Sequence, residues 1–86
     1  MVPMDRFTTK DGTLDAAADP AAAWARLAAY EDVWDELTTS LVAVPIELAA
    51  LKAAGREKTV RYRELVGAKL WLAETTALFA RHGITP

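Results

Sequence analysis

The C-terminal stretch of the chain decides its fold: residues 57–82 read EKTVRYRELVGAKLWLAETTALFARH. Apolar residues recur in it at steps of three and four, which is the spacing of one face of an α-helix. The pattern predicts one long helix over residues 57–82 that serves as the core element of the fold. Its expected packing face consists of Val66, Leu70, Ala73, Ala77, Ala80 and Ile84, widened on one side by Leu65, Leu72 and Phe79.

A second helical region precedes this stretch and begins at Asp19-Pro20. Aspartate caps the free N–H groups of a first helical turn, and proline fits the first helical position. From there, apolar residues alternate steps of four and three, which is the spacing of a seam between packed helices. The seam consists of Ala23, Leu27, Tyr30, Trp34, Leu37, Leu41, Val44, Leu48 and Leu51.

Pro45 lies inside that seam. A proline ring clashes with the carbonyl four residues earlier and removes one helical hydrogen bond. We therefore expect a helix over residues 20–40, a kink or break near Pro45, and a second helix over residues 45–54 that Gly55 ends. Together with the helix over 57–82, this predicts an all-α helical hairpin or three-helix arrangement, antiparallel where the connection is short.

Residues 1–18 are expected to form an N-terminal arm and residues 19–86 a single helical domain. Within the arm, Asp11-Gly12 stands between short β-favouring runs, as in a small hairpin. Two strands alone are marginally stable, so an ordered hairpin and an irregular arm remain open alternatives. The arm lacks the apolar run of a signal peptide. No uncharged apolar run reaches the about 20 residues of a membrane span, and the chain has no cysteine, so we expect a cytoplasmic protein.

Charge is unevenly distributed along the chain. Residues 52–69 carry six basic and two acidic side chains, although the formal net charge of the chain is −2. The basic run could contact the phosphates of a nucleic acid, or it could be a solvated turn that offsets an acidic stretch of the first helix. The candidate nucleic-acid-binding residues are Arg56, Lys58, Arg61 and Arg63, and the acidic stretch is Glu31, Asp32, Asp35 and Glu36.

The sequence lacks the residue sets that catalysis or metal binding require. His82 is the only histidine, and the Glu-x-x-His pattern of four-helix di-metal sites is absent. Ser40 is the only serine, and the chain contains no cysteine, asparagine or glutamine. A glycine-rich phosphate-binding loop is also missing. We expect neither an enzyme nor a protein with a metal or another cofactor.

Lys69 is an exception within the expected packing face of residues 57–82. An unpaired ammonium group is costly to bury, so we expect Lys69 to extend towards solvent or to find a carboxylate. Glu31 and Asp35 on the first helix are the candidate partners.

A second apolar stripe lies on the opposite side of the same helix. Trp71 and Leu78 are seven residues apart, and Val60 lies roughly in line with them. A simple helical hairpin has no need of large apolar residues there. Either the N-terminal arm covers them, through Phe7 or Leu14, or a second chain does. A second chain implies a homodimer or a complex with another protein.

One short segment resembles a known group of proteins. Residues 26–32 read RLAAYED, and this segment is similar to one that recurs in small open reading frames of phages and prophages from Gram-positive bacteria. In those proteins it runs on into a Thr-Gly turn, whereas here Val33-Trp34 follows and extends the helix. The resemblance implies a mobile-element accessory protein. Many such proteins bind and block host machinery, anti-CRISPR inhibitors among them.

Our functional hypothesis is a small non-enzymatic protein–protein interaction module that binds through Val60, Trp71 and Leu78. The acidic residues 31–36 could mimic phosphates if the target handles nucleic acid. Two alternatives remain open: a nucleic-acid-binding protein that uses the basic segment 52–63, and a self-assembling structural helical subunit.

Overall fold

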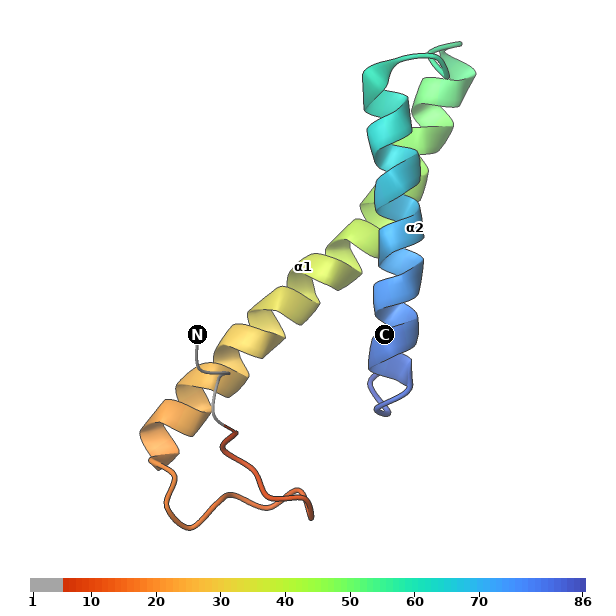
Figure 1. The fold of residues 1–86 in the computed structure, drawn as a ribbon. Helices are drawn as coiled ribbons and strands as arrows, with labels where there is room; N and C mark the ends of the chain where they lie inside the picture. Colours follow the sequence, from red (N-terminus) through yellow and green to blue (C-terminus); the bar gives the residue numbers. More distant parts are fainter. Residues whose placement is uncertain (1–5) are drawn as a thin grey trace. The chain divides into compact units, whose positions relative to one another are not determined.

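The computed structural model describes residues 6–86 and places most of them in two helices, with no strand among them. Helix α1 spans Pro20–Ala53 and helix α2 spans Val60–Ala80 (Figure 1). The chain divides into two compact units, an N-terminal unit that ends at Val33 and a C-terminal unit, Trp34–Pro86. The all-α prediction is confirmed.

The start of α1 follows from its local sequence. Pro20 is the first helical residue, and the Asp19 side chain accepts a hydrogen bond from the backbone N–H of Ala21 at 3.3 Å. Proline loses nothing at this position, because the first N–H groups of a helix have no partner within the helix. The predicted start at Asp19-Pro20 is therefore confirmed.

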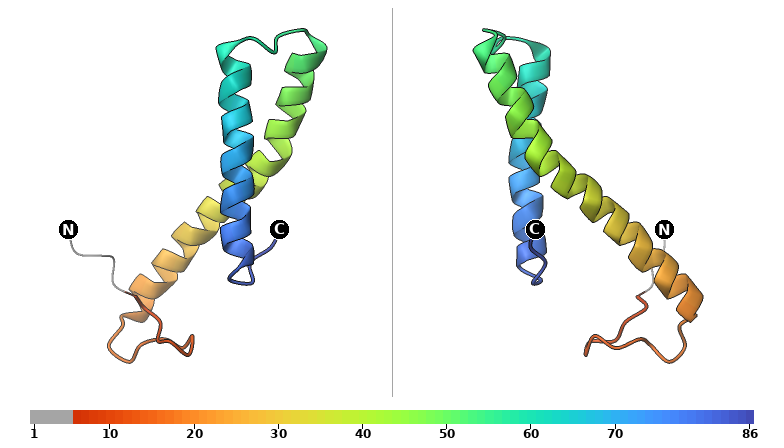
Figure 2. Two further views of the ribbon diagram at one scale, coloured as in Figure 1. Left: turned by 45° about the vertical axis from the view of Figure 1, so that its right-hand side comes forward. Right: turned by 180° about the vertical axis from the view of Figure 1, so that it is seen from behind.

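The predicted three-helix arrangement is wrong, because α1 runs unbroken through Pro45 (Figure 2). A proline inside a helix costs about 3 kcal/mol. Leu37 and Val44 before the proline and Leu48 after it lie on one face and are buried in the same core. Burial of such side chains contributes about 1.5–3 kcal/mol each, so packing on both sides of Pro45 outweighs the break that proline favours.

Gly55 ends α1 as predicted. Its φ of 70° places it in the left-handed region that glycine adopts without strain. The N–H of Gly55 donates to the carbonyl of Lys52 at 3.0 Å, and the N–H of Arg56 donates to the carbonyl of Leu51 at 2.9 Å. This bond pair is the Schellman closure of a helix C-terminus. The short connection that follows reverses the chain, and α1 and α2 run antiparallel within the C-terminal unit (Figure 1).

Helix α2 is shorter at both ends than the predicted range 57–82. It begins at Val60 because Thr59 is its N-cap: the Thr59 side chain accepts a hydrogen bond from the N–H of Tyr62 at 3.2 Å. At the other end Gly83 has a φ of 82°, and the N–H of Ile84 donates to the carbonyl of Phe79 at 3.0 Å. Gly83 therefore closes the C-terminus of α2 in the left-handed conformation.

The core lies between the two helices of the C-terminal unit. Leu65 and Leu72 of α2 are each 4 % exposed, and they pack with the buried residues of α1. The rings of Trp34 and Phe79 meet with centroids 4.9 Å apart. Three further residues, Tyr62, Leu41 and Leu51, complete the core at partial burial. This packing decides which side of α2 faces inward.

The packing face predicted for α2 is wrong, because the buried stripe is centred on other residues. Val66 and Leu70 are 47 % and 63 % exposed, whereas Leu65, Leu72 and Phe79, expected only at its margin, form the core. Helix α2 has apolar residues around most of its circumference, and a hairpin supplies one neighbouring helix. One stripe can be covered, and the others remain on the surface.

The N-terminal unit contains an ordered small hairpin, one of the two alternatives for the arm. A single antiparallel bridge joins Thr8 and Leu14. The turn between them is closed by backbone bonds from the N–H of Thr9 to the carbonyl of Thr13 (2.8 Å) and from Gly12 to Thr9 (3.0 Å). Gly12, with φ of 81°, occupies the left-handed position that such a turn requires.

Candidate functional site

The α2 surface, defined as Val60, Trp71 and Leu78, is exposed on the outside of the C-terminal unit. The three residues are 69 %, 59 % and 47 % exposed. Trp71 lies about 100° around the helix from its buried neighbour Leu72. Val60 is eleven residues before Trp71 and Leu78 is seven after it, and both steps return to nearly the same direction around the helix. The arrangement of α2 against α1 therefore places all three side chains in one line away from the core.

The arm residues proposed as a cover for this surface are engaged within the N-terminal unit. The guanidinium of Arg26 lies 4.1 Å from the centroid of the Phe7 ring, a cation–π contact. Leu14 is held in the small hairpin by its bridge to Thr8. Leu14 itself is 48 % exposed.

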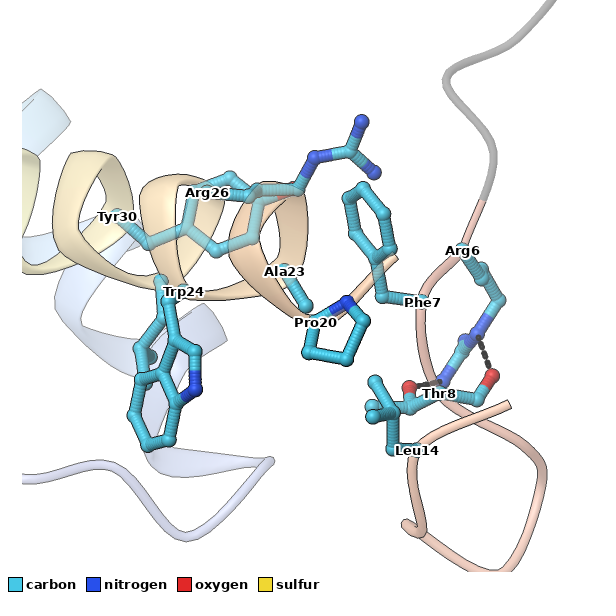
Figure 3. A pocket seen from close by; sticks show the side chains of 10 residues that line it. Arg6, Phe7, Thr8, Leu14, Pro20, Ala23, Trp24, Arg26 and Tyr30 are labelled. Atoms are coloured by element: carbon cyan, nitrogen blue, oxygen red, sulfur yellow. Dashed lines mark hydrogen bonds between the residues drawn. The ribbon is translucent and has the colours of Figure 1, made fainter. Parts of the chain in front are cut away.

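The same arm residues form a pocket with the first turns of α1 (Figure 3). Its volume is about 590 Å³. The Arg6 side chain at its margin is tied to Thr8 through the hydroxyl at 3.1 Å and the carbonyl at 3.4 Å. The sequence analysis missed this pocket, although the apolar seam extends into it. Its apolar lining residues are Phe7, Leu14, Pro20, Ala23, Trp24, Leu27 and Tyr30.

Two of the four candidate nucleic-acid-binding residues, Arg61 and Arg63, have side-chain contacts within the C-terminal unit. Arg61 forms a two-point ion pair with Glu47 of α1, with Nε–Oε1 at 2.9 Å and Nη2–Oε2 at 3.0 Å. The hydrogen bonds to Glu47, and then its charge, raise the pKa of Arg61 above its ordinary value. Arg63 donates to the carbonyl of Lys58 at 3.4 Å. The basic segment thus serves partly to hold the turn against α1.

The acidic residues 31–36 are exposed along α1. Glu31 and Asp32 belong to the N-terminal unit, and Asp35 and Glu36 belong to the C-terminal unit. None of the four forms an ion pair with any residue of the described range 6–86. Within that same range, no group of three or more His, Asp or Glu side chains is placed to hold a metal ion.

Lys69 is exposed, so the prediction that it lies within the core face is wrong. The core is centred on Leu65 and Leu72, which turns Lys69 to the margin of the helix pair. There it borders a shallow groove together with Lys52 and Tyr62. A carboxylate partner is no longer needed to explain Lys69, because its ammonium group reaches solvent.

The outer side of α1 in the C-terminal unit carries two further apolar residues that the sequence analysis did not single out. Val42 and Ile46 are each 65 % exposed. The signal was present in the sequence, because Glu47 is the only charged residue between Leu37 and Leu51. The periodicity of the seam predicts which face of this helix packs, but it does not indicate that the opposite face is apolar as well.

In the part of the chain that the structure describes, neither helix is long and apolar enough to cross a membrane. Comparison with known proteins finds no matching family model. No curated protein and no solved structure matches the chain either.

Proposed function

We propose that the protein is a small interaction module that acts by docking the α2 surface on another protein. The observation that carries this proposal is the exposure of Trp71, at 59 %. Tryptophan is enriched among the residues that dominate binding energy at protein interfaces. Leu78 and Val60 extend its apolar area along the same line of the helix.

The free energy that burial of this surface would contribute supports a docking role. Burial of a large apolar side chain contributes about 1.5–3 kcal/mol relative to exposure. The core of the described chain has only five buried apolar residues. Trp71 and Leu78 therefore add a large apolar area that the fold leaves exposed to solvent. A polar rim is present beside them, since Glu64 and Glu74 lie on exposed positions of the same helix.

The resemblance of residues 26–32 to phage and prophage open reading frames supports a target in host machinery. On this proposal the protein blocks its target by occupying a surface, and it needs no catalytic residue. The exposed carboxylates Asp35 and Glu36, without an ion pair within residues 6–86, add negative charge that could mimic phosphates.

Capture of partners from host lysate tests the proposal. The wild-type chain is compared with a Trp71→Asp/Leu78→Asp variant, and proteins retained on each are quantified by mass spectrometry. We expect at least one partner to be lost from the variant, because two carboxylates in a buried apolar interface remain unpaired.

A Trp24→Asp variant is the matched control for this experiment. Trp24 is 71 % exposed on the N-terminal part of α1, so its replacement removes an exposed tryptophan elsewhere on the chain. We expect this variant to retain the partners of the wild type. Equal recovery of all partners by the Trp71→Asp/Leu78→Asp variant would contradict the proposal.

Nucleic-acid binding is the weaker candidate. It relies on Arg56, Lys58, Arg61 and Arg63, and the ion pair of Arg61 with Glu47 removes one of these cations from the proposed contact. Phosphate contacts weaken steeply as salt increases. A titration with mixed-sequence DNA and RNA at low salt therefore separates this candidate from a protein-binding module.

A further inference from the structure

The segment of α1 from Leu41 to Leu51 has one polar side chain, that of Glu47, and it is bound to Arg61. A helix that is apolar around its whole circumference is normally covered on all sides. Here α2 covers one side, where Leu37, Val44 and Leu48 are buried. The composition of this segment therefore predicts a second neighbour on its other side.

The uncovered side has the regular spacing of a helix-packing stripe. We define the outer α1 face by residues that recur at steps of three and four, the spacing of a two-helix seam. Val42 and Ile46 at its centre are each 65 % exposed. The small side chains at its ends allow another helix to approach closely. The outer α1 face consists of Thr39, Val42, Ile46, Ala49 and Ala53, all exposed.

Charges at the two ends of this face are opposite in sign. Asp35 and Glu36 lie before it. Lys52 lies near its far end, on the flank that borders the groove beside α2, and Arg56 follows the end of the helix. None of these four side chains forms an ion pair with any residue of the described range. A helix with the same order of charge that packs in the opposite direction places its basic end beside the acidic end of this face and its acidic end beside the basic end. The helix α1 of a second copy has this order, whereas a parallel copy would bring like charges together.

We infer that the outer α1 face is a homodimer interface in which two copies of α1 pack antiparallel. This inference goes beyond the proposed function, because it uses another helix and another partner. The pairing sets Val42 of each copy opposite Ile46 of the other, and Thr39 opposite Ala49. Asp35 then comes level with Ala53 of the second copy, between its Lys52 and Arg56.

This arrangement is closed and self-complementary. The two copies use the same patch and are related by a two-fold axis, so the interface does not lead to a fibre. From Asp35 to Ala53 the contact would extend about 27 Å at 1.5 Å per residue. Each copy retains its own α2 surface, and the dimer therefore presents two copies of it to a target.

Sedimentation velocity over a range of concentrations tests the inference. We expect the wild type to be a dimer, and Val42→Glu and Ile46→Glu to weaken association on the order of a hundredfold, because a carboxylate enters an apolar interface. Leu70→Glu is the matched control: Leu70 is 63 % exposed on α2, and this variant should remain dimeric. Circular dichroism establishes that each variant is helical.

Charge reversal tests the antiparallel register. Asp35→Lys or Lys52→Glu alone should weaken the dimer about tenfold, by replacing an attraction with a repulsion at both ends. The combined Asp35→Lys/Lys52→Glu variant restores opposite charges and should recover affinity to within about threefold of the wild type. A structural defect would not be rescued in this way.

Cysteine cross-linking tests the direction, because the chain has no cysteine of its own. A mixture of Val42→Cys and Ile46→Cys chains should form disulfide-linked heterodimers in preference to either homodimer. A monomeric wild type, preferential cross-linking of like positions, or a dimer unaffected by Ile46→Glu would each overturn the inference. The Trp71→Asp/Leu78→Asp variant should remain dimeric, which separates this result from the test of partner capture.

Discussion

The two parts of the α1 seam have the same sequence pattern but different surroundings. From Trp34 onward the seam lies in the C-terminal unit, and Leu37, Val44 and Leu48 are buried there. Before Trp34 it lies in the N-terminal unit, where Leu27 and Tyr30 are 46 % and 56 % exposed and line the pocket. Regular apolar spacing therefore indicates that a face is suited to packing, but it does not indicate what covers that face.

The largest expected effect distinguishes the two parts of the seam directly. Leu48→Ala should destabilise the fold by about 3 kcal/mol, because it leaves a cavity between the helices. Leu27→Ala, the same substitution on the same stripe, should cost less than about 1 kcal/mol, since Leu27 is 46 % exposed. Urea unfolding followed by circular dichroism measures both. Equal losses would show that the N-terminal part of the seam is covered as completely as the C-terminal part.

The next effect concerns the turn that brings α2 back over the C-terminal part of the seam. Gly55→Ala should destabilise the hairpin by about 1 kcal/mol, because φ at this position is 70°. Gly67→Ala should stabilise it by up to about 1 kcal/mol, because Gly67 is inside α2 and an added methyl group meets no atom within 4 Å. Thermal unfolding of the two variants should therefore shift in opposite directions. A shift of the same sign for both would contradict the role assigned to Gly55.

The smallest effect concerns the charged contact beside the covered part of the seam. Glu47→Gln removes the ion pair with Arg61, and since both side chains are about half exposed and screened by solvent we expect no measurable shift in the unfolding midpoint. The substitution leaves Arg61 with its longer ion pair to Glu64, at 3.9 Å. We expect neither the wild type nor this variant to retain mixed-sequence DNA at low salt. Tighter DNA binding by Glu47→Gln would favour the nucleic-acid alternative and show that Glu47 restrains it.

The helix termini could be predicted because each depends on neighbouring residues alone. Asp19 supplies an acceptor to the first turn of α1, and Gly55 and Gly83 adopt the positive φ that closes a helix. Thr59 was missed as the N-cap of α2, although its hydroxyl is the usual signal for one. The basic residues around Thr59 favoured a different interpretation of the same segment.

The candidate site was predictable only as a set of exposed residues. The seven-residue spacing of Trp71 and Leu78 placed them together on α2, and both are exposed. The ion pair of Arg61 with Glu47 joins residues fourteen apart in the sequence, and neither residue type nor spacing identified it. Contacts of this kind depend on how two helices are rotated about their axes.

The sequence by itself determined the helical class, the start of α1 at Pro20 and the end of α1 before Gly55, because local hydrogen bonding and backbone conformation control these features. Only the tertiary structure decided that α1 continues through Pro45 and that Leu65 and Leu72, rather than Val66 and Leu70, face the core. The physical reason is the same in both cases. The apolar pattern is compatible with several packings, and the burial gained between α1 and α2 outweighs the local preference at Pro45 and selects one stripe of α2.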